Sequence, residues 1–127
     1  MEDHQIQKTR TGVDRIARAW GISLKGLRAA WLEKAFRQEV ALSVVMVPLA
    51  FVLGRSWPET LLMLLSVGLV LICEVTNSAI EAVVDRIGPE FHELSGRAKD
   101  MGSAMVFVAI VLCVLAYVGT LVLRLRG

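Results

Sequence analysis

The feature that most constrains this chain is a run of 23 residues without a charge, MGSAMVFVAIVLCVLAYVGTLVL, at 101–123. At about 1.5 Å per residue, a helix of that length crosses the hydrocarbon core of a bilayer. Two further apolar blocks lie at 40–53 and at 61–73, the second continuing to about residue 84. A chain of 127 residues cannot bury three wholly apolar helices within itself, so the blocks predict membrane spans.

We therefore expect an all-α integral membrane protein that forms one domain over 1–127. The first block is the shortest and contains Pro48, so it crosses only if its flanking residues help to pass the headgroup zone. The expected elements are a cytoplasmic arm with a surface helix, three spans and a cytoplasmic loop: 1–35, about 36–54, 59–86 and 98–123, and 87–97.

The residues before the first span predict an amphipathic helix lying in the membrane surface. From Val13 to about Arg37, apolar residues recur every three or four positions, with basic residues between them. Trp20 and Trp31 belong to the apolar stripe, and tryptophan favours the headgroup level. Periodicity alone fits a plain membrane anchor equally well.

The basic residues predict the orientation. Eleven of the 14 Lys and Arg residues lie before the first span or around the second connection, which places both in the cytoplasm and the C-terminus outside. A net charge of +2 is too small to indicate a nucleic-acid partner, and no nucleic-acid motif is visible. Anionic lipid headgroups are the natural neighbours of the basic arm.

The second apolar block leads into ICEVTNSAIEAVVDR (72–86), whose polar side chains share one helical face: Glu74, Asn77, Ser78, Glu81 and Asp85. We call this face the acidic stripe. A carboxylate at membrane depth costs a few kcal/mol unless it is paired or wetted. One interpretation is ion pairing with nearby Lys or Arg. The other is a water-accessible cleft of oxygen ligands, which Mg²⁺ prefers.

Further functional groups are expected at the same level. Lys99, Asp100 and Ser103 open the third span, and Glu33 lies near the end of the surface helix. Acids for a metal, with Lys and Arg for oxyanions, suit phosphoryl transfer from a nucleotide. The phosphate-binding motifs of soluble enzymes, such as GxxxxGK[ST], do not occur in the sequence, so such a site would be specific to the membrane.

The sequence resembles the small integral-membrane diacylglycerol kinases of bacteria, from about Arg15 to the end of the third span. The resemblance is carried by KGLRAAW (25–31), AFRQE (35–39), ExxNSAIEAVVDRIG (74–88) and HELSGRAKDMGSA (92–104). It implies ATP-dependent phosphorylation of 1,2-diacylglycerol to phosphatidic acid with Mg²⁺ in the bacterial inner membrane. It also implies a homotrimer with active sites between subunits. A three-helix subunit has too few neighbours to cover its own acidic face, which fits that arrangement.

The resemblance also implies roles for single residues. Glu74 corresponds to the general base on the lipid hydroxyl, and Asn77 can orient Glu74 or Glu81. Glu81 and Glu33 correspond to the carboxylates that hold Mg²⁺ on the nucleotide. Aligning back from AFRQE places Glu33 there, whereas aligning forward from AAW shifts that role. The remaining positions are Lys99 and Asp100 at the phosphates, Arg15, Glu90, Phe91 and His92 at the nucleotide, and Arg15, Glu39 and Ser103 at the lipid.

Two alternatives stay open at this point. A polyprenol kinase of the undecaprenol type shares the ExxNSAIE core, although AFRQE favours the diacylglycerol branch. A proton- or cation-conducting oligomer would also place acids in a membrane. A conductor, however, needs polar groups over the full depth of the bilayer. Here the charges gather at one end, because the outer half of the second span is apolar apart from Ser66.

Overall fold

The computed structural model describes residues 12–127, so the first part of the expected cytoplasmic arm, 1–11, lies outside the described residues. The described residues form four helices, which are α2 (Gly12–Trp31), α3 (Lys34–Leu53), α4 (Trp57–Ile87) and α5 (Glu93–Arg126). The last three are long and apolar enough to cross a membrane, which confirms the expectation of three candidate spans.

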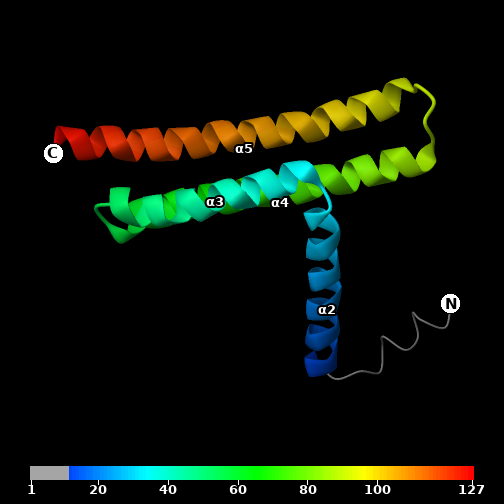
Figure 1. The fold of residues 1–127 in the computed structure, drawn as a ribbon, viewed down its shortest axis with the longest axis horizontal. Helices are drawn as coiled ribbons and strands as arrows, with labels where there is room; N and C mark the ends of the chain where they lie inside the picture. Colours follow the sequence, from blue (N-terminus) through cyan, green and yellow to red (C-terminus); the bar gives the residue numbers. More distant parts are fainter. Residues whose placement is uncertain (1–11) are drawn as a thin grey trace.

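The three long helices form a bundle, and α2 leaves it crosswise (Figure 1). Helix α4 is the central element, since it packs along α5 over much of its length and also against α3. The connection between α4 and α5 is short, so the two helices run antiparallel (Figure 1). Only the C-terminal end of α2 meets the bundle, where Ala30 is buried.

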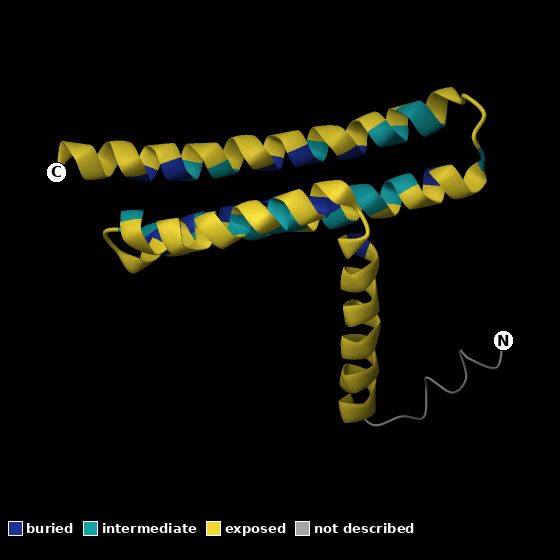
Figure 2. Ribbon diagram, viewed as in Figure 1, coloured by how far each residue is buried: buried dark blue, intermediate teal, exposed yellow. Residues whose placement is uncertain are grey.

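The bundle has two small clusters of buried side chains rather than a deep core. One contains Ala50, Met63, Val67 and Tyr117, and the other contains Val70, Cys73, Val106 and Ala109. The outward faces of the helices remain exposed (Figure 2). Even in α4, only 39% of the most apolar stretch is buried. Such extensive apolar exposure is expected of helices that face lipid or other subunits.

Helix α2 ends earlier than the apolar stripe suggests, because the chain turns at Leu32 and Glu33. Arg37 lies on the first turn of α3 rather than on α2. Its Nη1 atom donates to the carbonyl oxygens of Trp31 (3.0 Å) and Leu32 (3.2 Å). Carbonyls at a helix end have no intrahelical partner, so this arginine stabilises the corner.

Helix α5 begins at Glu93, before the expected start of the third span at 98. His92 explains the early start, because its Nδ1 atom accepts a hydrogen bond of 3.1 Å from the backbone N–H of Leu94. This is an N-cap, which satisfies one of the free donors at the helix start. The connection between α4 and α5 is therefore only residues 88–92.

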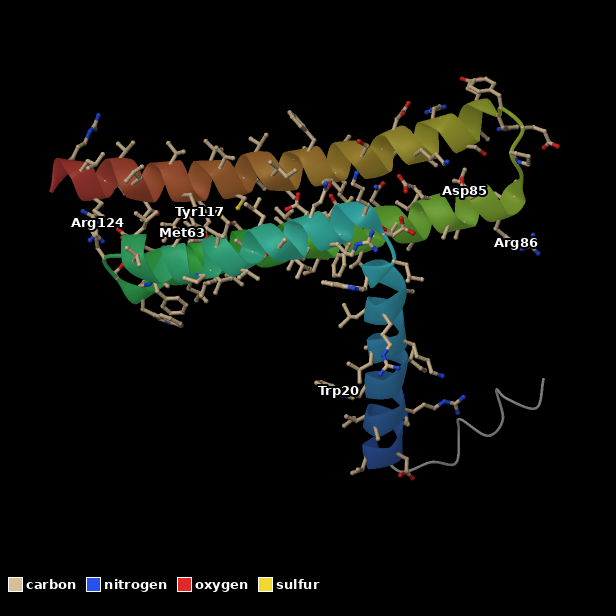
Figure 3. All side chains as sticks on the ribbon, in the orientation of Figure 1. Trp20, Met63, Asp85, Arg86, Tyr117 and Arg124 are labelled. Atoms are coloured by element: carbon tan, nitrogen blue, oxygen red, sulfur yellow. The ribbon has the colours of Figure 1, made fainter. Side chains whose placement is uncertain are left out.

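At the other end of the bundle, Arg124 of α5 lies beside the end of α3 (Figure 3). Arg124 Nη1 donates to the carbonyl oxygens of Val52 (2.6 Å) and Leu53 (3.2 Å), which end α3. Arg55 Nη1 donates in return to the carbonyl oxygen of Leu123 at 3.0 Å. Each arginine thus caps the C-terminal end of a neighbouring helix.

Candidate active site

The deepest carboxylate of the acidic stripe on α4, that of Glu74, faces the interior of the bundle. Glu74 is buried, with 7% of its surface exposed, although it carries an ionisable group within an apolar helix. The charges of Glu39 on α3 and Glu81 on α4 act on the Glu74 carboxylate. Three acids from two helices therefore share one region. Like charges that share one region repel each other, so a bound cation would reduce that repulsion.

Asn77 lies one helical turn beyond Glu74 and connects the stripe to α5. Its Nδ2 atom donates a hydrogen bond of 3.3 Å to Glu81 Oε1. Its Oδ1 atom is buried and has no hydrogen-bond partner among the described residues. That oxygen lies against the backbone of Gly102, where any side chain would collide with it.

Lys99 brings a positive charge to the stripe from α5. Its Nζ atom donates a hydrogen bond of 2.7 Å to Asp85 Oδ1, and the charge of Glu81 also acts on it. Figure 3 shows Asp85 pointing toward α5, while Arg86 points away from it. The side chains of Lys99 and Asp85 are 42% and 67% exposed, so solvent screens the pair and it contributes little to stability. Lys99 can therefore move to another anion at little cost.

The other expected site residues are mostly exposed and spread over several elements. Asp100 and Ser103 are exposed on α5, and Glu33 is exposed at the N-cap of α3. Glu90 and Phe91 are exposed in the connection after α4, and the His92 imidazole is engaged as a helix cap. Arg15 is exposed on the part of α2 that is farthest from the bundle (Figure 1).

Metal binding would need ligands beyond the side chains of one chain. Within residues 12–127, no group of three or more His, Cys, Asp or Glu side chains is close enough to hold a metal ion. Mg²⁺, however, is commonly bound by one or two carboxylates together with substrate phosphates and water. Glu81, oriented by Asn77, meets that smaller requirement.

An apolar groove lies next to the acids. It has a volume of about 230 Å³ and runs between α3, α4 and α5, from Glu39 and Ser43 at one end to Tyr117 and Val118 at the other. Most of its wall is apolar, and Glu39 connects it electrostatically with Glu74. A long apolar chain can therefore lie in the groove with its polar end near the acidic stripe.

Two contacts of this site were not predicted from the sequence. Ion pairing of the acidic stripe with Lys or Arg was one interpretation of the sequence, but the specific pairing of Lys99 with Asp85 was not predicted. The contact of Asn77 with Gly102 was missed as well. Its sign in the sequence was the pair Ala98 and Gly102, two small residues four positions apart, which permits a close helix contact but does not name Asn77 as the partner.

Comparison with known proteins identifies a family for this arrangement. The sequence model of prokaryotic diacylglycerol kinase matches residues 21–123. The diacylglycerol kinase of Escherichia coli (strain K12) is 56% identical over 108 residues, which cover 84% of this chain and 88% of that protein. That of Pseudomonas aeruginosa is 54% identical over 104 residues, covering 81% and 85%. That of Haemophilus influenzae is 50% identical over 109 residues, covering 85% and 91%.

Proposed function

Because the chain belongs to the prokaryotic diacylglycerol kinase family, it is a lipid kinase, and we propose that it performs phosphoryl transfer on the acidic stripe of α4. The γ-phosphoryl group of ATP passes directly to the hydroxyl of 1,2-diacylglycerol, and the product is phosphatidic acid. The observation that carries this proposal is the buried Glu74 beside two other carboxylates and an apolar groove.

Glu74 is the general base of the proposed reaction. The groove between α3, α4 and α5 suits an acyl chain, and Glu39 at its end supports a position of the glycerol hydroxyl near the Glu74 carboxylate. Glu74 then accepts the hydroxyl proton as the oxygen attacks phosphorus. A carboxylate within hydrogen-bond reach of the lipid hydroxyl is a suitable proton acceptor for this step.

Glu81 and Glu33 hold the nucleotide end of the site in this proposal. Mg²⁺, when bound, neutralises the negative charge of the ATP phosphates. Asn77 orients the Glu81 carboxylate through its 3.3 Å hydrogen bond. Lys99 leaves Asp85 and pairs with the phosphates, where it stabilises the charge that moves as the bond breaks. Asp100 lies beside Lys99, and Glu90, Phe91 and His92 border the nucleotide.

We also propose a homotrimer whose active sites lie between subunits. Helix α2 carries Arg15 away from the acids of its own chain, so a site on a neighbouring subunit is the one it can serve (Figure 1). The large exposed apolar area of the bundle supports contacts with further copies. Ser103, exposed on α5, then faces the lipid substrate.

The proposed setting is the bacterial inner membrane, with the N-terminus in the cytoplasm and the C-terminus in the periplasm. Helix α2 runs crosswise to the spans, as a helix in the membrane surface does, and Trp20 is exposed on it (Figure 3). The basic residues gather on the side of the acidic stripe, where ATP arrives.

The lipid specificity is tested by a Mg²⁺-dependent phosphorylation assay in mixed micelles with two acceptors. We expect turnover with 1,2-diacylglycerol and little with undecaprenol. Exclusive use of undecaprenol would contradict the proposed acceptor. A diacylglycerol reaction that needs no divalent cation would contradict the proposed role of Mg²⁺.

A further inference from the structure

We propose that Gly102 is a positioning residue for phosphoryl transfer. Because it has no side chain, it leaves room for the Asn77 carboxamide in the orientation that donates to Glu81. The inference rests on the proposed role of Glu81 in the nucleotide site. Gly102 is buried in α5, one turn after Lys99, and it faces the acidic stripe of α4.

The packing around Gly102 shows why glycine is needed there. A Cβ atom at this position would collide with Asn77 Oδ1 and would lie only 3.3 Å from Asn77 Cγ. The next nearest atom, Ile80 Cδ1, would be 3.6 Å away, which is an ordinary van der Waals distance. The close approach of the two helices alone therefore does not require glycine. The position of the Asn77 carboxamide is what requires glycine at 102.

The other glycines inside α5 lack such a neighbour. A Cβ atom at Gly96 or Gly119 would have no described atom within 4 Å outside its own stretch of helix. Gly102 is thus set apart by its contact with a side chain of the site. Glycine is less favourable than alanine inside a helix, and of these three glycines only Gly102 has a contact that requires it.

The consequences of adding a side chain follow from the contacts of Asn77. A methyl group at position 102 pushes the carboxamide away, and a short side chain can give way without unfolding the helix pair. Its Nδ2 atom then leaves Glu81 Oε1, which it contacts at 3.3 Å. Glu81 loses its orienting partner, and a small misplacement of a catalytic group costs much of the rate.

The test is a double-mutant cycle of Gly102→Ala and Asn77→Ala, with Gly119→Ala as the matched control on the same helix. We expect Gly102→Ala to keep its thermal unfolding temperature, to lower kcat about tenfold or more and to weaken binding of a non-hydrolysable MgATP analogue. Gly119→Ala should behave as wild type. In the Asn77→Ala background, Gly102→Ala should change neither kcat nor analogue binding further, since the colliding group is gone.

Wild-type kcat and analogue binding in Gly102→Ala would overturn the inference. Losses that multiply in the double mutant would also overturn it, because Gly102 would then act independently of Asn77. If Gly102→Ala does not fold, the double mutant should fold like Asn77→Ala, and its failure to do so would contradict the steric argument. A wrong proposal for Glu81 can be told apart from a wrong proposal for Gly102. In the first case Glu81→Ala itself would bind the nucleotide normally.

Discussion

Lys99 on α5 donates a hydrogen bond of 2.7 Å to Asp85 near the end of α4, so the lysine stands beside the acidic stripe with its charge already paired. Both side chains are partly open to solvent, and their pairing is weak enough to be exchanged for a stronger one with phosphate. The hydrogen bond to Asp85 therefore keeps the Lys99 ammonium group close to the place where the nucleotide is proposed to bind.

This pairing predicts that removing the Lys99 charge lowers kcat much more than removing the Asp85 charge does. Lys99→Met should lower kcat by about 10² or more, because the charge on the transferring phosphoryl group loses its cation. Asp85→Asn should keep kcat within about tenfold and change the free energy of unfolding little, because solvent screens the pair. Steady-state kinetics and equilibrium unfolding of both variants measure this.

Arg97→Met is the matched control for Lys99→Met, since it removes an exposed cation from the same stretch of α5. It should retain nearly all activity. Equal losses in Asp85→Asn and Lys99→Met would show that the pair itself matters, and the proposed transfer of Lys99 to phosphate would then be wrong.

Removing the Arg124 side chain should lower the stability of the protein without changing its catalytic rate. Its two hydrogen bonds to the end of α3 lie at the opposite end of the bundle from the acidic stripe. Arg124→Ala should lower the free energy of unfolding in micelles by about 1–2 kcal/mol and leave kcat per folded enzyme unchanged. Arg126→Ala is the control for loss of a terminal charge. A larger effect of Arg126→Ala would contradict the capping role of Arg124.

The apolar groove predicts a variant that is defective in lipid binding alone. Ser43 is half-buried in its wall, one turn from Glu39, and Ser43→Leu fills part of the 230 Å³ volume. We expect the apparent KM for long-chain diacylglycerol to rise about tenfold, while the KM for MgATP stays constant. Ala41→Leu, on the exposed side of α3, should not change either value. An unchanged lipid KM in Ser43→Leu would exclude the groove as the acyl site.

The sequence predicted those features that depend on one helix at a time. Uncharged runs long enough for a bilayer identify the spans, and the spacing of Glu74 and Glu81 places both on one face of α4. The rotation of α5 against α4 depends on how their side chains interlock, and that alignment decides that Lys99 meets Asp85 and that Asn77 meets Gly102. Helix ends were also displaced, since His92 and Arg37 cap helices through contacts that hydropathy does not report.

The central claim is that lipid and nucleotide meet along the acidic stripe, with the base at Glu74 and the nucleotide site at Glu81. Thr76→Val is the matched control, because Thr76 is exposed on another face of α4. It should keep nearly normal turnover.

The most direct test compares turnover and MgATP binding in Glu74→Gln and Glu81→Ala. Glu74→Gln should lower kcat by about 10² or more while MgATP binding stays close to wild type, since only the general base is lost. Glu81→Ala should weaken MgATP binding itself. Normal turnover in both variants would show that the acidic stripe is structural and would contradict the account.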